Sequence, residues 1–191
     1  MQIQTHGFYK ACQAGFTLIE VLVTLLVLAI GLMGLAGLQA KMLNAQLESY
    51  QRSQAVMLAE DMANRLRANV SAARDAEYVS ATVYGINNVL GDTDCDAGSV
   101  VDKDLCAWNQ ALKGASTTDG GQQLGSMIGA RGCIDSISGS ATSQVVVRVT
   151  VVWQGLSPTV APSSTCGEDS YGDDRQRRAI SVDVTLAYLG V

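Results

Sequence analysis

Glu20 is the acidic side chain at the start of a long apolar segment. The next twenty positions, residues 21–40, contain no charged side chain. As a helix they would span about 30 Å, the thickness of a bilayer's hydrocarbon core. An acidic side chain at the centre of a membrane helix costs roughly 2.5–3.5 kcal/mol. The chemistry predicted for Glu20 is therefore ionic pairing with a partner of opposite charge.

The junction before this segment carries a specific pattern. Residues 15–21 read G-F-T-L-I-E-V, and the polar stretch before them contains Lys10 and no acid. A secretory signal peptide would be cleaved after its apolar stretch, whereas here the polar-to-apolar junction comes first. The pattern resembles the type IV pilin family, in which a short hydrophilic leader precedes the apolar helix. A single-span anchor with a chance glutamate is the plainer alternative.

The resemblance implies how the N-terminus is processed. A prepilin peptidase would cut between Gly15 and Phe16 on the cytoplasmic side and methylate the new Phe16 amine. The Glu20 carboxylate would then pair with the Phe16 amine of an adjacent subunit. The partners implied are other minor and major pilins, the inner-membrane assembly platform and the inner membrane itself. The chain would cross that membrane once with its head in the periplasm, and later reach the pilus fibre or tip.

Two further stretches, residues 25–39 and 57–69, and an element with Asp104, Leu105 and Trp108 resemble one branch of the family. This branch is the minor pilins called type IV pilus modification protein V. It implies incorporation into the pilus fibre or priming of it, with roles in pilus assembly, twitching motility and cell adhesion. The alternatives are a type II secretion minor pseudopilin, a ligand-binding tip module for adhesion or DNA uptake, and a monomeric membrane-anchored periplasmic protein.

Composition argues against nucleic-acid binding and catalysis. The chain has 18 acidic and 13 basic side chains and a formal charge of −5, so we expect no electrostatic capture of nucleic acid. Its sole histidine, His6, lies in the leader. No glycine-rich phosphate loop, activated serine or catalytic cysteine arrangement occurs. We expect no enzymatic activity and no cofactor.

The hydrophobic periodicity predicts one helix from about Phe16 to Ala73, because no proline precedes Pro158. We expect a leader over residues 1–15, a transmembrane helix over 16–40, an amphipathic continuation over 41–73 and an α+β head over 74–191. The continuation carries a mostly apolar stripe, and we expect its second half to be core, covered by the head. Its members are Leu43, Leu47, Tyr50, Gln54, Leu58, Met62, Leu66 and Val70.

Alternating apolar residues predict two strands in the head, over residues 144–154 and 179–188, with a shorter strand near 133–137. Each long strand has an apolar and a wetter face, which favours a small antiparallel sheet packed on one side against the long helix. The α+β class follows from this pattern, and the resemblance implies the type IV pilin fold. The loop over 157–174 is a candidate contact surface. Residues 77–132 show no regular pattern except for a helix near 104–113, capped by Asp102 or Asp104, whose Trp108 is a core residue.

Four cysteines follow the leader, which itself contains Cys12. Four thiols allow three pairings. We favour Cys95 with Cys106, which closes a local loop, and Cys133 with Cys166, which ties the first predicted strand to the later loop. These bonds would contribute roughly 3 and 4 kcal/mol in the loop-entropy model. A metal site with four cysteine ligands is the alternative, but no C-x-x-C spacing occurs.

The acidic clusters offer no clear metal site. Asp92, Asp94 and Asp96 alternate as in a calcium loop, but Ala97 and Lys103 stand where an EF-hand needs glycine and glutamate. A looser calcium site stays open beside the plainer reading of a solvated acidic loop. The second cluster lies beside three arginines and is most simply surface charge. Its acids are Glu168, Asp169, Asp173 and Asp174, and the arginines are Arg175, Arg177 and Arg178. We therefore expect no metal.

Overall fold

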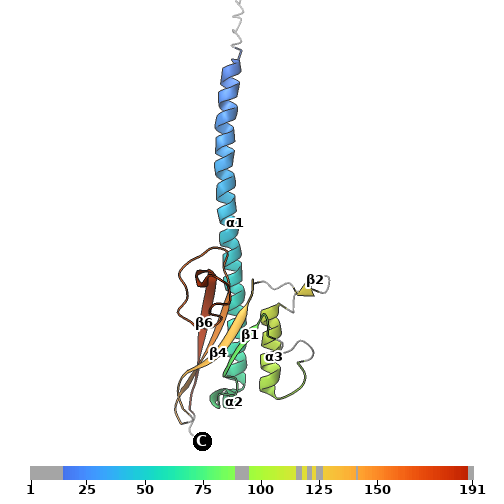
Figure 1. Ribbon diagram of the computed structural model, residues 1–191, viewed down its shortest axis with the longest axis vertical. Helices are drawn as coiled ribbons and strands as arrows, with labels where there is room; N and C mark the ends of the chain where they lie inside the picture. Colours follow the sequence, from blue (N-terminus) through green and yellow to red (C-terminus); the bar gives the residue numbers. More distant parts are fainter. Residues whose placement is uncertain are drawn as a thin grey trace, which may run out of the picture. The chain divides into compact units, whose positions relative to one another are not determined.

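The computed structural model describes residues 15–88, 95–114, 118–119, 122–123, 127–140 and 142–188. The chain divides into two compact units, residues 1–43 and 44–191, which are described separately below. Helix α1 (Leu18–Ala68) contributes its first part to one unit and its second part to the other. Figure 1 shows the order of the elements along the chain. Residues 1–14 of the expected leader lie outside the described residues.

In the first unit, α1 has no covering structure. Every described residue of this unit, 15–43, is exposed, including large apolar side chains such as Leu18 at 89% and Met33 at 78%. By length and composition, α1 is the one helix of the described chain that can cross a membrane, with a mean hydropathy of 2.6 over its most apolar window. Such a surface is stable only when lipid or other apolar surfaces cover it.

The second half of α1 ends earlier than the sequence suggests. The helix stops at Ala68, Asn69 adopts φ −121° and ψ 63°, and a short helix α2 (Val70–Arg74) follows. The expected uninterrupted helix to Ala73 is therefore wrong at Asn69. The Asn69 side chain instead donates a hydrogen bond to the Tyr78 hydroxyl (3.2 Å), and asparagine commonly exchanges helix geometry for such bonds.

Four antiparallel strands form the sheet of the second unit in the order β1-β4-β5-β6. They are β1 (Ser80–Gly85), β4 (Arg131–Ser138), β5 (Val145–Gln154) and β6 (Arg177–Leu186). The three strands expected from the sequence are confirmed, although β6 begins and ends two residues early. The sequence analysis missed β1, as well as two short strands, β2 (Thr118–Asp119) and β3 (Gln122–Gln123).

The core lies between this sheet and the helices of the same unit. The odd-numbered side chains of β5, from Val145 to Trp153, are buried in it. The second half of the expected apolar stripe is confirmed at Met62 and Leu66, which are fully buried, but not at Val70, which is 38% exposed. In the first half, Leu47 and Tyr50 are 52% and 55% exposed. The buried positions of α1 include three alanines that the stripe did not contain; the full set is Gln51, Ala55, Ala59, Met62, Ala63 and Leu66. The small alanine side chains let the helix approach the sheet closely.

Helix α3 (Val100–Lys113) is capped by Ser99, and not by Asp102 or Asp104 as expected. The Ser99 hydroxyl accepts from the Asp102 backbone N–H (3.2 Å), and the Asp102 carboxylate accepts from the Ser99 N–H (2.9 Å). This is a reciprocal capping box. Backbone and side-chain hydrogen bonds from Ser99 also lower the pKa of Asp102. The helix ends at Gly114 in the left-handed conformation, φ 79°.

Trp108 anchors α3 in the core, as expected. It is fully buried, and its indole N–H donates to the Leu58 carbonyl of α1 (2.8 Å). The ring lies against Gly132 of β4, where a Cβ atom would collide with it. Gly132 therefore sets the closest approach of α3 to the sheet.

The sheet is covered on both faces at one end, which corrects the expectation of a single packed side. A second buried cluster consists of Cys133, Val152, Cys166 and Tyr171. Cys166 and Tyr171 belong to the loop between β5 and β6, and the Tyr171 hydroxyl donates to the Gly129 carbonyl (2.8 Å). Part of the loop that we expected to be a contact surface is therefore packed against the sheet.

Candidate functional site

The N-terminal segment begins with a capped helix end. The Thr17 side chain accepts from the Glu20 backbone N–H (3.3 Å), and the Thr17 carbonyl accepts from the same group (3.1 Å). Thr17 and Glu20 have the spacing of a capping box, of which the threonine half is present. A carboxylate in the first turn also interacts favourably with the helix dipole. The T-x-x-E spacing was readable in the sequence, but the sequence analysis did not use it.

The structure brings the expected N-terminal residues together at this helix end. Gly15 and Phe16 precede the first helical residue and are exposed, Phe16 at 83%. Glu20 lines a shallow groove on the helix surface with Phe16, Val21 and Thr24. The Thr24 hydroxyl is satisfied by the Val21 carbonyl (2.8 Å). Among the described residues, Glu20 forms no ion pair, so its carboxylate is available to a partner.

In the second unit, a polar network holds α3 against α1. Arg65 of α1 forms ion pairs with Asp61 and with Asp104 of α3, each at 3.0 Å. The Tyr78 hydroxyl donates to the other oxygen of the Asp104 carboxylate (2.6 Å). Tyr78 is fully buried, and this burial together with the bond to Asp104 raises its pKa to about 12. The network joins two parts of the sequence that are about forty residues apart.

Two family models match the chain. The prokaryotic N-terminal methylation motif matches residues 10–36, and the type IV pilin Tt1218-like family matches residues 37–113. The first match contains Gly15, Phe16 and Glu20, and the second contains the network around Asp104. Together the two matches support a type IV pilin-like protein. It has no significant match among the curated proteins or among the solved structures.

The N-methylation motif of this pilin-like chain implies processing by a prepilin peptidase and association with other pilins. Its α+β fold, a long N-terminal helix packed against an antiparallel sheet, is the pilin fold. Pilins are structural proteins. Strands β4, β5 and β6 lie beyond both matched segments, so their arrangement comes from the structure alone.

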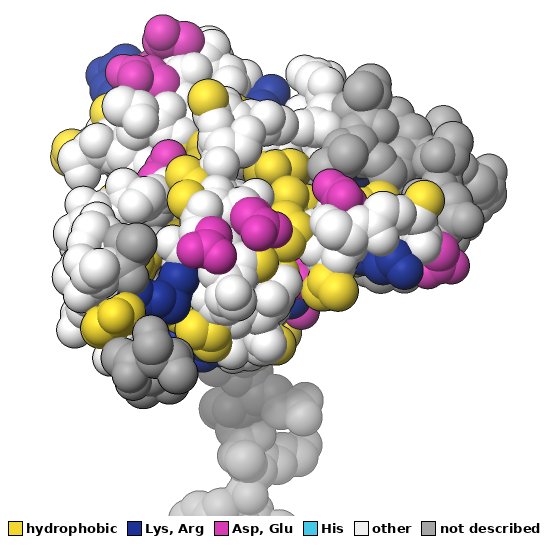
Figure 2. All heavy atoms as spheres, turned by 90° about the horizontal axis from the view of Figure 1, so that it is seen from below, with side chains coloured by type: hydrophobic (Ala, Val, Ile, Leu, Met, Phe, Trp, Pro, Cys, Tyr) yellow, Lys and Arg dark blue, Asp and Glu magenta, His cyan; other side chains and the backbone are white. Residues whose placement is uncertain are grey.

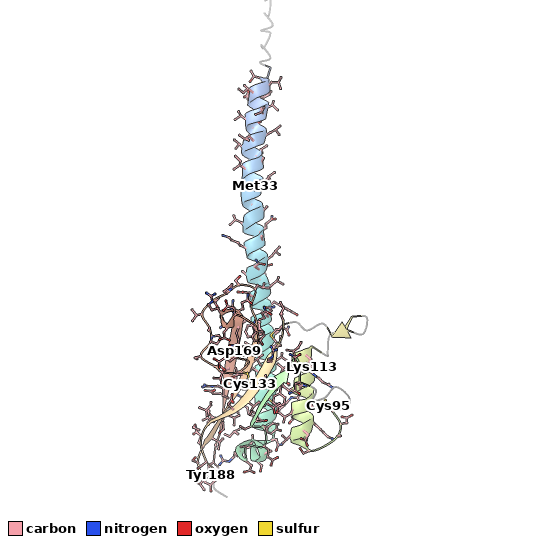
Figure 3. All side chains as sticks on the ribbon, in the orientation of Figure 1. Met33, Cys95, Lys113, Cys133, Asp169 and Tyr188 are labelled. Atoms are coloured by element: carbon pink, nitrogen blue, oxygen red, sulfur yellow. A yellow bond between two sulfur atoms is a disulfide. The ribbon has the colours of Figure 1, made fainter. Side chains whose placement is uncertain are left out.

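Two disulfides reinforce the pilin head: Cys95 with Cys106, and Cys133 with Cys166, with Cα separations of 5.5 and 5.9 Å. These are the pairs that the sequence analysis favours. The first bond attaches the segment before α3 to the helix itself. The second attaches the β5–β6 loop to β4. Figure 3 labels Cys95 and Cys133 in these two parts of the head.

Arg177, at the start of β6, organises the β5–β6 loop. It is 1% exposed and pairs with both Asp174 carboxylate oxygens, at 2.6 and 2.8 Å. Its other donors reach the carbonyls of Pro162, Ser164 and Cys166. The hydrogen bonds from Arg177 lower the pKa of Asp174. The sequence analysis assigned this arginine to surface charge, which is wrong. The assignment failed because nothing in the neighbouring sequence indicates that Arg177 is buried.

The acidic clusters are partly accounted for. Asp173 pairs with Arg175 (2.8 Å), and this contact lowers the pKa of Asp173. Asp92 and Asp94 of the calcium hypothesis lie outside the described residues. Within the described part of the chain, no group of three or more potential metal ligands occurs.

The titration of Tyr78 gives a test of the network. Its pKa is raised from 10.0 to about 12, so the stability that the neutral phenol contributes is present below pH 10 and lost as the pH rises toward 12. We expect the unfolding free energy of the full chain in detergent to fall over this range. Tyr78→Phe should be less stable at neutral pH and should lack the part of the alkaline loss that is due to Tyr78. Tyr50→Phe, at an exposed position, is the control; an alkaline loss that Tyr78→Phe leaves unchanged would contradict the assignment.

Proposed function

We propose that this pilin-like chain is a minor pilin of the type IV pilus, of the type IV pilus modification protein V group. Prepilin peptidase cleaves it between Gly15 and Phe16 and methylates the Phe16 amine. The mature chain, beginning at Phe16, enters the fibre or primes its assembly. Its domains in this proposal are the leader 1–15, the membrane segment 16–40, the amphipathic segment 41–73 and the periplasmic head 74–191.

One observation carries the proposal: an apolar helix whose described part in the first unit is wholly exposed and begins with a capped, unpaired carboxylate. Before assembly, lipid covers this apolar surface, and Glu20 bears the cost of an acidic group beside hydrocarbon. In a bundle of such helices, neighbouring segments cover the surface, and the methylated Phe16 amine of an adjacent subunit supplies the counter-ion. Transfer from lipid to the bundle then gains a charge pair at little loss of apolar burial.

The head supports this role through rigidity. The network around Asp104 and the indole bond to Leu58 fasten it directly to the second part of α1, and the two disulfides brace the head internally. A head held by several independent contacts transmits force between the fibre and its surroundings without unfolding. This agrees with roles in pilus assembly, twitching motility and adhesion.

The mass of the mature N-terminus tests the proposal. We expect the membrane-derived protein to have the mass of residues 16–191 plus one methyl group, with Phe16 as its first residue. Intact-protein mass spectrometry, combined with sequencing of the N-terminal peptide, measures this directly. A mature chain that begins at Met1, or one that never occurs in sheared fibres, would refute the proposal.

Deletion of the protein separates the proposal from its nearest alternatives. Loss of pili with normal protein secretion supports a minor pilin, and the reverse result supports a type II secretion pseudopilin. A DNA-uptake module would need a basic surface. On the face of the head in Figure 2, the acidic and basic side chains of the described residues are interspersed, and basic ones do not gather into one patch.

A further inference from the structure

The second unit has a surface groove between α1 and the ends of β5 and β6. Its lining includes Ser49 and Arg52 from the helix, Trp153 from β5 and Arg178 from β6. Glu48 also lines it and pairs with Arg178 (3.2 Å). The groove therefore contains two guanidinium groups and one carboxylate, and its charge is positive on an acidic protein.

Arg178 is held in a fixed position in this groove. Besides Glu48, its guanidinium donates to the Ser157 carbonyl (2.7 Å) and the Arg175 carbonyl (3.3 Å). Its side chain is 18% exposed. Gly155 lies so close that a Cβ atom there would be 2.6 Å from the Arg178 Cζ atom. A guanidinium fixed by three acceptors loses little side-chain entropy when a ligand arrives.

Arg52 is the second cation of the groove, and it is exposed. In the described part of the chain it forms no ion pair. The groove thus combines one immobilised cation with one available cation. That combination fits a carboxylate, which accepts hydrogen bonds from both sides.

A complementary acidic surface occurs on the same chain. Glu168 and Asp169 are adjacent, exposed and without an ion pair among the described residues. Asp169 is in the left-handed conformation, φ 57°. Backbone hydrogen bonds from Glu168 to the Thr165 carbonyl (3.1 Å) and from Ser170 to the Gly167 carbonyl (3.2 Å) order the loop tip; Figure 3 labels Asp169 on it.

This loop tip is held away from the groove of its own chain. The disulfide from Cys166 fixes it to β4, whereas the groove lies along β6, and β5 separates these two strands. The groove and the loop belong to the same end of the sheet, where β5 ends and β6 begins. The exposed acids Asp75 and Glu77 instead follow α2, near the other end of the head (Figure 1). When two copies lie parallel, the groove of one copy is at the same height as the loop tip of the other. Asp75 and Glu77 of the second copy are then not at the height of the groove.

We propose that the groove around Arg52 and Arg178 binds the Glu168–Asp169 loop tip of a second copy of this chain. The two surfaces differ, so the contact is heterologous: each copy offers a free groove and a free loop to further copies. Such contacts generate chains or rings and not closed two-fold dimers. The contact goes beyond the proposed function, since it requires no assembly machinery.

Cysteine cross-linking of the chain in detergent tests this contact, in a Cys12→Ser background so that the four remaining native cysteines are all in disulfides. Ser49→Cys places a thiol in the groove, and Ser170→Cys places one beside the intact acidic pair. Under mild oxidation, each single variant alone should give no dimer, and a mixture of the two should give dimers only. The double variant should give a ladder of higher oligomers. Dimers formed by one single variant alone, or no cross-links in the mixture, would overturn the proposal.

Charge reversal shows whether the ion pairs drive the contact. Arg52→Glu should lower the yield of cross-links at least about tenfold, because like charges then face each other. Combining it with Glu168→Arg and Asp169→Arg should restore the yield. Lys103→Glu reverses an exposed cation on α3 and should have no effect. If Arg52→Glu and Lys103→Glu reduce cross-linking equally, the contact is non-specific and the proposal fails. If cross-links instead form only with a different pilin, a second copy of this chain is not the partner of the groove and the proposal fails.

Discussion

Replacing Glu20 with alanine is expected to abolish incorporation of the chain into fibres while leaving cleavage after Gly15 largely intact. In the assembled bundle, the methylated Phe16 amine of a neighbour would lose its counter-ion in an apolar surrounding. Removing one partner of a buried ion pair costs about 3–5 kcal/mol. This corresponds to at least about a hundredfold in the association constant. Immunoblots of sheared fibres and of membranes from the same cells measure incorporation and cleavage separately.

Two substitutions distinguish pairing from other roles of this helix end. Glu20→Gln keeps the size and hydrogen-bonding capacity of the side chain but removes its charge, so it should fail as Glu20→Ala does. Thr17→Ala removes the cap bond to Glu20, which is worth about 1 kcal/mol, and should reduce incorporation only mildly. Normal piliation by either Glu20 variant would exclude the charge pair as the basis of assembly.

The elements with strong hydrophobic periodicity were predictable from the sequence. Strand β5 alternates valines over ten residues, and its partner β6 alternates almost as regularly, so both were identified within two residues. Strand β1 was missed because its sequence, S-A-T-V-Y-G, shows little alternation, and because its pairing with β4 contains a register shift. The sheet supplies β1 with a partner that local sequence does not indicate.

The buried face of α1 was not predictable from apolar size alone. The sequence analysis placed the second half of the apolar stripe in the core, where Met62 and Leu66 are indeed buried. It did not include Ala55, Ala59 and Ala63, which are also buried, and Leu47 and Tyr50 of the first half are exposed. Hydrophobic periodicity identifies apolar faces without saying which partner covers them. A pilin offers two such partners, its own sheet and neighbouring subunits. Here the alanines pack within the chain together with Met62 and Leu66, and Leu47 and Tyr50 are left for contacts outside it.

The N-terminal site was predictable because its residues are contiguous. Gly15, Phe16, Thr17 and Glu20 lie within six positions, and a single turn of helix brings them together. The polar network of the head was not predictable from the sequence, because Arg65, Tyr78 and Asp104 meet only after α3 folds back onto α1. Burial of Arg177 likewise depends on a loop whose course the sequence does not specify.

Arg177→Met is expected to lower the unfolding free energy of the head by about 3–5 kcal/mol, the usual cost of breaking a buried pair by removing one partner. Methionine fills most of the space but donates no hydrogen bonds, so three loop carbonyls and Asp174 lose their partner. Thermal and urea unfolding of the full chain in detergent measure the loss. Hydrogen exchange should localise it to residues 155–176, because the Cys133–Cys166 bond keeps the opened loop attached.

Arg175→Met is the matched control, two residues away. Arg175 pairs with Asp173, but its side chain is 66% exposed, and exposed pairs contribute little to stability. We expect no measurable change from it. The dependence of stability on pH in the acid range provides an independent check. The pKa of Asp174 lies below its ordinary 3.8 because of Arg177. The stability from this pair is therefore present above pH 3.8 and lost as the pH falls through the lowered pKa. Arg177→Met should make the loss of stability at acid pH smaller. If Arg177→Met and Arg175→Met lower the unfolding free energy equally, burial of Arg177 does not strengthen its ion pair and the prediction is wrong.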